Sequence, residues 1–392
     1  MSSEDVVVIG AGPAGLAAAA ELRRHGVRAL VIERSDAVGA AWRGRYDSLR
    51  LHTPRELSGL PGLPIPREMT RWVARDDLVT YLEQYAAHHR LDVQFGAEVT
   101  RIVRTPAGAW QVALADGGTL TVAHVVVAAG NSNTTAPLDV PGADTYTGEL
   151  VPAPDYRNGA RFAGGRVLVV GSGNTGTDIA VDLVRHRAAS VWLAVRTPPH
   201  ILPRNRGPVA AQHAGVLVRH LPLPVADRLG WLVTRLTTPG LRSHGLARPR
   251  TGLLTRVVRD GKIPVLDHGI VGAIRAGTVR PVAALARLDG SDAVLVDGSR
   301  FAVDAVVAAT GYRRGLEPLV GALGVLDGRG RPPVDGGRAV PGAPGLWFIG
   351  YTDPISGMLR EIRIESRRLA NAIATGARQR TSHAVRVVPP TV

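Results

Sequence analysis

The segment Gly10-Ala11-Gly12-Pro13-Ala14-Gly15 holds the first residues whose types and spacing suggest chemistry. A β-branched run, 6–9, precedes it, and an alanine-rich run that favours a helix, 16–24, follows it. This order predicts a strand, a tight turn and a helix. In such a turn the first glycine permits the bend, the second lets a pyrophosphate approach the backbone, and the third lets the helix pack on the strand. The helix N-terminus then faces the anion, so the segment predicts a dinucleotide site.

An acidic residue follows the next predicted strand, at the position where a dinucleotide site has a carboxylate for the ribose. A second apolar run, 29–32, ends in Glu33, about 20 residues beyond the turn, where a carboxylate meets a ribose hydroxyl. The strand context and the acid together favour a dinucleotide site over the alternative, a glycine-rich turn in an unrelated α/β protein. We expect Glu33 and the adjacent Arg34 to contact the same ligand.

The pattern occurs a second time in the middle of the chain. An apolar run, 167–170, leads into Gly171-Ser172-Gly173-Asn174-Thr175-Gly176, and a run with helical periodicity, 177–184, follows. The next predicted strand, 191–195, is followed by Arg196 instead of an acid. An arginine fork binds the 2′-phosphate of NADP, which a carboxylate would repel. We therefore interpret this turn as an NADP site and the first as an FAD site; the alternative for Arg196 is a solvated charge at a strand end.

Two further apolar strands indicate how the domains connect. The runs 125–128 and 305–308 each lead into a small-residue turn, which is typical of a crossing between two dinucleotide-binding domains. We predict an α/β fold with two Rossmann-like domains, the NADP domain being inserted in the FAD domain. The expected bounds are 1–150 for the first part of the FAD domain, 151–309 for the NADP domain, and 310–392 for the second part of the FAD domain with a C-terminal tail. Hinges are expected at 145–165 and after Tyr312.

A substrate lid is expected at about 205–250 within the NADP domain. Its least regular part, 216–236, mixes apolar and charged residues, and Pro222 and Pro224 argue against a single long helix lying on a membrane. We favour the lid over membrane contact, since lids concentrate on irregular loops. Near the C-terminus, 357–373 predicts a helix whose N-terminus either faces the flavin or caps an ordinary surface helix.

Composition excludes several other kinds of chemistry. The 392 residues contain no cysteine, which rules out disulfides, thiolate metal sites and cysteine nucleophiles, and no metal site is predicted. The net charge of +14 comes almost wholly from scattered arginines, and aromatic residues are only 4%, so nucleic-acid binding is not expected. The acidic start of the chain, 1–5, lacks the basic flank of a signal peptide, and the longest apolar stretch, 6–20, is too short to span a membrane. We expect a cytoplasmic protein; a homodimer is left open.

Taken in order, several further segments resemble the class B flavin monooxygenases, and within them the plant YUCCA-type enzymes and their bacterial relatives. The segment 38–42 resembles the family's flavin-contacting segment, and 46–54 resembles the loop beneath the isoalloxazine. The segments 155–159, 196–204 and 261–267 also match, as does the Ala309-Thr310-Gly311-Tyr312 signature. The resemblance covers most of the chain and is specific as an ordered set.

The turns and this resemblance together give the expected site residues. Arg204 is a candidate second contact to the NADP phosphate. The residues expected to bind a cofactor are Gly10, Gly12, Pro13, Ala14, Gly15, Glu33, Arg34, Gly39, Trp42, His52, Val99, Ala129, Gly130, Tyr156, Gly171, Ser172, Gly173, Asn174, Thr175, Gly176, Arg196, Thr310, Gly311, Tyr312, Gly350 and Asp353.

The resemblance implies an NADPH- and FAD-dependent monooxygenase acting on a small organic substrate with O2, through a flavin C4a-(hydro)peroxide, in specialised metabolism. The oxidised centre would be nitrogen, sulfur or a carbonyl. The catalytic candidates are His52, where many members carry an asparagine, and Asn131. A neutral imidazole both donates and accepts a hydrogen bond, enough to steer a proton. The alternatives are a loop histidine satisfied by backbone groups and an asparagine that only satisfies its turn.

One position departs from the family's fingerprint. Tyr146, Gly148 and Tyr156 fit it, but Pro152 stands where the family has a histidine. Tyr156 in place of tryptophan favours the N- and S-oxidising or YUCCA-like branch over Baeyer-Villiger enzymes. The change to Pro152 motivates an alternative function, an NADPH-consuming flavin oxidase or reductase that releases hydrogen peroxide. A remoter alternative is an arginine-rich binding protein without catalysis.

Overall fold

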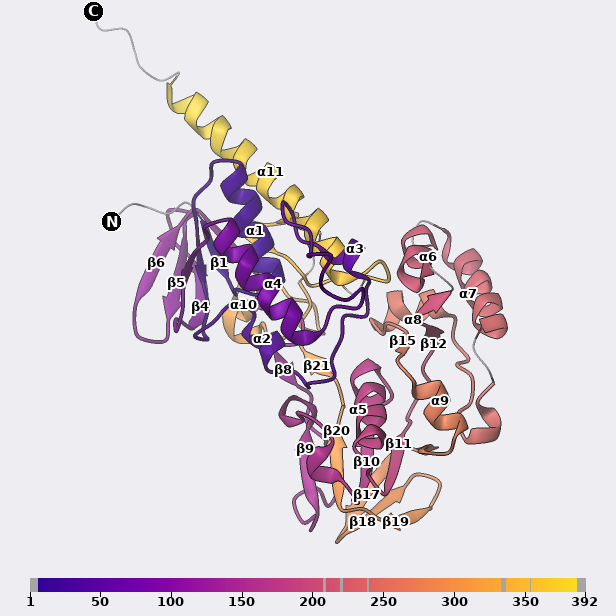
Figure 1. Cartoon of the computed structure of the whole chain (residues 1–392). Helices are drawn as coiled ribbons and strands as arrows, with labels where there is room; N and C mark the ends of the chain where they lie inside the picture. Colours follow the sequence, from indigo (N-terminus) through magenta and orange to yellow (C-terminus); the bar gives the residue numbers. More distant parts are fainter. Residues whose placement is uncertain are drawn as a thin grey trace, which may run out of the picture.

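Two sheets, one parallel and the other parallel except for its edge strand, form the centre of the computed structural model (Figure 1), which describes residues 6–206, 209–218, 221–237, 240–332, 336–352 and 354–385. The first sheet has the order β22-β23-β7-β1-β2-β3. Its central strand β1 (Val6–Ile9) pairs in parallel with β2 (Ala29–Ile32) and with β7 (His124–Val127). All four residues of β1 are buried, as expected for a strand covered on both faces. The sheet is completed by β3 (Asp92–Gln94), β22 (Ala339–Val340) and β23 (Ala343–Phe348).

Three helices cover one face of this sheet. α1 (Pro13–Arg24) lies beside the long C-terminal helix α11 (Met358–Val385), and α4 (Arg75–His88) packs next to α1 (Figure 1). The run of alanines in α1 is fully buried, because small side chains let α1 approach β1 and α11 closely. The helix therefore holds the Gly10–Gly15 turn in a fixed position at the carboxyl end of β1.

The second sheet has the order β16-β11-β10-β20-β9 and is parallel throughout. Its strands are β9 (Glu149–Pro152), β10 (Arg166–Val170), β11 (Ser190–Ala194), β16 (Val279–Val282) and β20 (Ala305–Ala308). α5 (Asn174–Arg185) packs on β10 and β11 with one face buried, and α9 (Ile270–Arg275) packs on α5. This second strand, turn and helix repeat the arrangement of the first.

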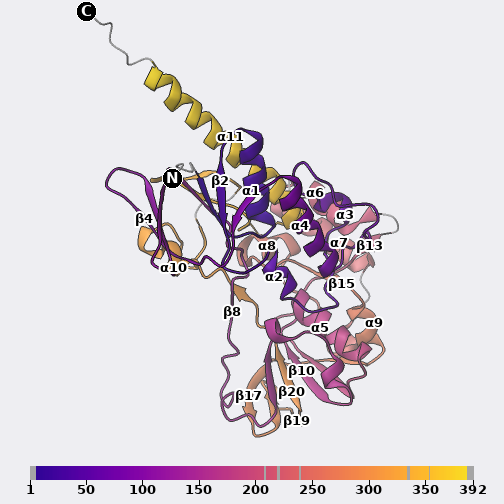
Figure 2. The same cartoon turned by 60° about the vertical axis from the view of Figure 1, so that its left-hand side comes forward.

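Each parallel sheet carries a small antiparallel one. The first of these contains β4 (Val99–Arg104), β5 (Trp110–Leu114) and β6 (Thr119–Val122); the second contains β17 (Leu285–Asp289), β18 (Asp292–Leu295) and β19 (Arg300–Ala302). The two segments that cross between the large sheets pair with each other through β8 (Thr134–Thr135) and β21 (Tyr312–Arg313). Figure 2 shows β8 running between the two bodies of the molecule.

The remaining elements lie in the loops around these sheets. They are α2 (Ala40–Arg43), α3 (Arg55–Ser58), α6 (Ala211–Val218), α7 (Leu223–Thr237), α8 (Leu253–Asp260), α10 (Glu317–Val320), β12 (Ile201–Pro203), β13 (Asn205–Arg206), β14 (Val209–Ala210) and β15 (Val265–Asp267). No helix within the described ranges has both the length and the hydropathy that crossing a membrane requires.

The α/β fold with one dinucleotide-binding domain inserted in another is confirmed. Strands at 29–32 and 305–308 occur with the predicted bounds. The segment 145–165, predicted to be a hinge, contains β9, which continues the second sheet by pairing with β20; its role as a hinge stays a prediction. Residues 138–146 also pack on the hydrophobic cluster of that sheet. The predicted helix 357–373 begins one residue later and runs to Val385.

The region predicted as a lid forms separate short helices. α6 and α7 are distinct, as the two prolines suggested. Several side chains of α7 face solvent, including Val225, Trp231 and Leu236. Asp227 of α7 accepts hydrogen bonds from Leu254 and Thr255, which ties α7 to the start of α8. The role of this region as a lid stays a prediction.

Candidate cofactor sites and the cluster between them

The first glycine-rich turn leaves open space where a ligand needs it. A Cβ at Gly15 would overlap the carbonyl oxygen of Gly10, so only glycine lets α1 pack here. Gly10 has φ +106° and lies against the carbonyl oxygen of Ala128 at the end of β7. A Cβ at Gly12, by contrast, would meet no atom within 4 Å. The space in front of the α1 N-terminus is therefore open, as a bound pyrophosphate requires.

Glu33 is fixed at the rim of this turn. One carboxylate oxygen accepts a hydrogen bond from the amide of Ala11 at 2.7 Å, and the other accepts one from the amide of Ser35 at 3.0 Å. The neighbouring Arg34 is exposed and donates to Asn133 at 3.1 Å. The carboxylate is thereby held at the carboxyl end of β2 beside the turn, the position expected for a ribose contact.

Other expected residues gather around the same turn. The amide of Gly39 donates to the carbonyl of Ala11 at 3.1 Å, which brings the segment with Trp42 next to it. Gly350, with φ +81°, follows β23, and a Cβ there would lie 2.9 Å from Cβ of Ala14. Val99 begins β4 and pairs with Leu114. Asp353 lies outside the described residues.

The second turn has the same geometry. A Cβ at Gly176 would overlap the carbonyl of Gly171, and a Cβ at Gly171 would overlap that of Ala309, where the second crossing begins. A Cβ at Gly173 would meet nothing within 4 Å. In both domains, then, a crossing strand ends against the first glycine and the middle glycine faces open space. Pro13, Ser172 and Thr175 lie within these turns and are half-buried.

The side chain of Asn174 forms hydrogen bonds with the backbone of a neighbouring segment. Its oxygen accepts from the amide of Leu266 at 3.0 Å and its nitrogen donates to the carbonyl of Pro264 at 3.1 Å. These bonds fasten the N-terminus of α5 to β15. The side chain therefore positions the turn, and only its backbone is free to face a ligand.

Two cations lie together beyond the second turn. Arg196 is exposed and follows β11. Burial, with the positive charges of Arg196 and Arg256, lowers the pKa of Lys262 below its ordinary value. Besides burial, the charges of Arg196 and Arg256 act on Lys262, so the three cations form a group that would suit a bound phosphate. The sequence reasoning missed Lys262 because it lies on the loop before β15, remote from the turn in the chain.

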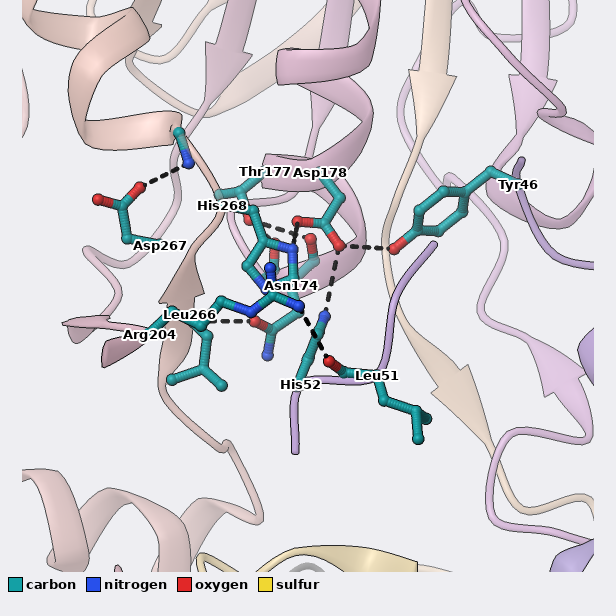
Figure 3. Close-up of polar contacts among 12 residues, drawn as sticks. Tyr46, Leu51, His52, Asn174, Thr177, Asp178, Arg204, Leu266, Asp267 and His268 are labelled. Carbon is teal, nitrogen blue, oxygen red and sulfur yellow. Dashed lines mark hydrogen bonds and ion pairs between the residues drawn. The ribbon is translucent and has the colours of Figure 1, made fainter. Parts of the chain in front are cut away.

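A cluster of titratable groups occupies the junction between the two domains (Figure 3). His52 contributes Nε2 at 3.4 Å from one carboxylate oxygen of Asp178 on α5, and His268 contributes Nδ1 at 3.4 Å from the other. Tyr46 donates a 2.8 Å hydrogen bond to Asp178 from the same loop as His52. Asp178 is only 8% exposed, and His268 13%. The loop of the first domain is thus joined to α5 of the second.

The charges in this cluster follow from its burial. Burial alone would raise the pKa of Asp178, but the hydrogen bond and charge of His52 and the charge of His268 outweigh it and lower that pKa. Burial lowers the pKa of His268 to about 4, so His268 is neutral near pH 7. Burial and the adjacent Asp178 carboxylate raise the pKa of Tyr46 well above its ordinary value, which keeps its hydroxyl a donor.

Arg204 lies against this cluster. It donates to the carbonyl of Leu51 at 3.4 Å, and its guanidinium stacks 3.9 Å above the ring of Trp72. Its Nε is buried and has no hydrogen-bond partner among the described residues. Burial and the nearby Arg50 lower the pKa of Arg204 to about 10. Arg204 thus contacts the loop at the domain junction, and its predicted contact to the NADP phosphate stays a prediction.

The crossing strands place the remaining expected residues. Ala129, Gly130 and Asn131 follow β7 in a turn with φ +88° at Gly130. Thr310 donates to the carbonyl of Ala136 on the other crossing strand. Gly311 has φ +104° with open space beside it, and the guanidinium of Arg45 lies 4.4 Å from the ring centre of Tyr312.

Tyr156 has no exposed surface in this structure. Its side chain is 0% exposed, its hydroxyl donates to Asp182 of α5 at 2.7 Å, and its ring stacks on Phe162. The expected cofactor contact is replaced by packing, because the chain between the 3-10 turns Ala153–Asp155 and Ala160–Phe162 is hydrogen-bonded to Asp182 of α5. Pro152 ends β9 opposite Ala308 at the sheet edge, and it is exposed.

Sequence reasoning also missed the buried Glu365 of α11. One of its oxygens accepts from the amide of Gly350 at 2.9 Å, and the other accepts from the hydroxyl of Thr352 at 3.1 Å. A carboxylate that is 2% exposed stays charged only when donors surround it. The sequence did contain a signal for this residue, because Glu365 is a charged residue among the apolar positions of the predicted helix.

Comparison with known proteins agrees with this architecture. The family model described as pyridine nucleotide-disulphide oxidoreductase matches residues 7–203. Indole-3-pyruvate monooxygenase YUCCA1 of Oryza sativa is 37% identical over 350 residues, covering 88% of this chain and 86% of that protein. A probable indole-3-pyruvate monooxygenase YUCCA1 of Arabidopsis thaliana is 34% identical, covering 88% and 84%.

Solved structures give the same relationship. The flavin-containing monooxygenase from Stenotrophomonas maltophilia superposes with a TM-score of 0.72 at 25% identity, over 95% of this chain and all of that one. A steroid monooxygenase bound to NADP has the same fold, with a TM-score of 0.74 at 20% identity over 96% of this chain and 87% of that one. Because the chain has no cysteine, the disulfide chemistry named in the family model is excluded. The chain belongs to the class B flavin monooxygenases, in their YUCCA-like branch, and is a flavin-dependent monooxygenase.

Proposed function

We propose that the protein binds FAD at the first turn and NADPH at the second, and transfers one atom of O2 to a small organic substrate. The observation that carries the proposal is the repeated turn, with open space at Gly12 and at Gly173. A negative charge lies beside the first turn and positive charges lie beside the second. Glu33 suits a ribose hydroxyl, whereas Arg196 and Lys262 suit a 2′-phosphate. The bound pair would supply hydride transfer and O2 activation, which no side chain of the chain can supply.

The residues at the first turn fit FAD. Gly350 and Ala14 meet there, and Glu365 holds the Gly350 turn in place from α11. A Cβ at Gly357, just before α11, would press against Thr53, so the α11 N-terminus reaches the loop that carries His52. A helix N-terminus stabilises negative charge close to it. We infer that α11 favours the reduced state of the flavin.

His52 is the side chain best placed to handle a proton. It is 23% exposed, so one face of the imidazole meets the junction while Nε2 is held near Asp178. A carboxylate beside an imidazole fixes the orientation of its ring. His52 would steer a proton at the site of oxygen transfer, and the closed junction would exclude water from it.

We propose that the substrate is a small organic acid. Relatives at 37% and 34% identity are named for indole-3-pyruvate, a 2-oxo acid. In this chain Arg204 offers a buried Nε without a partner among the described residues, on the same side of the junction as His52. A carboxylate would satisfy that nitrogen in a bidentate pair. The oxidation would then be carbonyl-centred, ahead of nitrogen or sulfur.

Turnover with a substrate panel tests the proposal. FAD-loaded protein is supplied with NADPH and, separately, with indole-3-pyruvate, a simple ketone, a thioether and an amine, while NADPH loss, product and hydrogen peroxide are measured. We expect product and NADPH loss to match for the 2-oxo acid. Protein that binds no FAD, or turnover whose product fraction is zero for every compound, contradicts the proposal.

A second function is favoured by one observation, the exposed Pro152 in place of the fingerprint histidine. It is an NADPH-consuming oxidase that releases hydrogen peroxide. The panel separates the two functions, because the oxidase yields one peroxide per NADPH with every compound.

A further inference from the structure

The junction cluster also offers a set of metal-ligating atoms, a property separate from the proton-handling role proposed for His52. Ligand atoms of His52, Asp178 and His268 all lie within 4.8 Å of one another. We propose that these residues form a binding site for a divalent transition-metal ion, with Zn²⁺ as its representative. The three residues come from a loop of the first domain, from α5 and from the segment before α9, so the site spans both domains (Figure 3).

The distances between these groups are long for hydrogen bonds and compatible with metal coordination. Both His–Asp contacts measure 3.4 Å, whereas an N–H···O bond is usually about 2.9–3.0 Å. Ligands about 2.0–2.1 Å from a tetrahedral ion lie about 3.3–3.4 Å apart. The two imidazole nitrogens lie at this spacing from different oxygens of the carboxylate, and one ligand atom from each residue lies within 4.8 Å of the others, so a small rotation of the carboxylate would bring one oxygen close to both nitrogens.

The donor set has a known chemical preference. Two imidazoles and one carboxylate bind zinc and similar first-row metals and leave a fourth position for water or another ligand. The carboxylate is also supported from behind, since Tyr46 donates a 2.8 Å hydrogen bond to it. Such a partner orients a ligand and raises its affinity.

Arg204 limits the strength of the site. Its guanidinium lies close enough for its charge to act on both Asp178 and His268. A cation beside a metal ion opposes binding, so we expect affinity weaker than that of closed structural zinc sites. A bound ion would still have two effects. It would coordinate Nε2 of His52, so that this nitrogen could no longer accept a proton, and it would fix the loop that carries His52 to α5. Inhibition of turnover by Zn²⁺ rests on the proposed function; the binding itself does not.

Calorimetric titration of chelator-treated, FAD-loaded protein with ZnCl₂ tests the site. We expect one bound ion per chain, and binding weakened at least about tenfold in His268→Ala and in Asp178→Asn. The matched control is His186→Ala. His186 lies 3.6 Å from Asp182 on the same helix, but that pair belongs to no cluster of three such ligands among the described residues. Circular dichroism checks that each variant folds. If Asp178→Asn does not fold, the comparison of His268→Ala with the control decides whether the site exists.

Titration with Co²⁺ adds a spectroscopic readout, because a tetrahedral nitrogen and oxygen site gives visible absorption that His268→Ala must lose. Wild-type protein that binds no Zn²⁺, or His268→Ala that binds it as His186→Ala does, overturns the proposal. If the wild type binds Zn²⁺ as expected but shows no NADPH turnover at all, the metal site stands and the proposed function fails.

Discussion

The hydroxyl of Tyr46 donates a 2.8 Å hydrogen bond to Oδ2 of Asp178, and both side chains are buried. Tyr46 belongs to the loop of the first domain and Asp178 to α5 of the second, so this bond joins the two dinucleotide-binding domains. The amide of Asp47 strengthens the junction by donating to the carbonyl of Arg157 at 2.8 Å. The relative position of the two proposed cofactors therefore depends on a few polar contacts.

Tyr46→Phe removes this bond and leaves a buried carboxylate with one donor fewer. We expect a loss of about 1–3 kcal/mol in the free energy of unfolding, measured in urea, with FAD still bound. Product formed per NADPH is expected to fall as well. Tyr85→Phe is the control, because the Tyr85 hydroxyl donates to Pro61 within the first domain. Equal coupling in the two variants would show that the Tyr46 bond is merely structural.

Gly12→Ala separates folding from FAD binding. A Cβ at Gly12 meets nothing in the fold and its φ of −82° suits alanine, so the melting temperature of the apoprotein is expected to stay close to that of the wild type. The methyl group would occupy the space required by the pyrophosphate, and FAD affinity is expected to drop at least about tenfold. Gly15→Ala is the contrast, since its Cβ overlaps the Gly10 carbonyl and must destabilise the fold. A Gly12→Ala protein that stays fully yellow after dialysis contradicts the assignment.

Glu33→Ala removes the carboxylate beside the first turn. It frees the amides of Ala11 and Ser35 and takes away the proposed ribose contact. We expect FAD affinity to fall by about 1.5–3 kcal/mol, the scale of hydrogen bonds to a charged group, in a reconstitution titration. Glu98→Ala, an exposed acid on the loop before β4, is expected to change nothing. Equal affinity in the two variants would remove Glu33 from the site.

Arg196→Ala and Lys262→Ala test the phosphate contact at the second turn. Each is expected to reduce the preference for NADPH over NADH by about 1–3 kcal/mol, measured as the ratio of kcat/KM for the two cofactors. Arg101→Ala provides an exposed arginine on β4 as the control. If only Lys262→Ala alters the ratio, the sequence-based assignment of Arg196 is wrong and the structure-based one holds.

His52→Ala tests the proton-handling role. FAD content is expected to be unchanged, while product formation slows about 100-fold, the lower range for a general acid or base. His244→Ala, an exposed histidine of the inserted domain, is the control. Product formation that matches the control would leave His52 with a structural role only.

The sequence was sufficient where structure is local. Both glycine-rich turns depend on residues within six positions, and the close packing of Gly15 on Gly10 and of Gly176 on Gly171 is what that spacing encodes. The position of Glu33 was also predictable, because it directly follows a predicted strand that ends beside the turn. The cluster of His52, Asp178 and His268 could not be predicted this way, because His52 and Asp178 lie 126 positions apart and meet only when two domains dock. Tyr156 shows the opposite error, since a family position that suggested a ligand contact is filled by packing on Asp182.

Isotope labelling with ¹⁸O₂ tests oxygen transfer most directly. FAD-loaded protein is supplied with NADPH, indole-3-pyruvate and ¹⁸O₂, and the product is analysed by mass spectrometry alongside peroxide release. We predict one ¹⁸O atom in the product for each NADPH consumed. NADPH loss that appears entirely as labelled hydrogen peroxide, with no ¹⁸O in any organic product, would contradict the monooxygenase function.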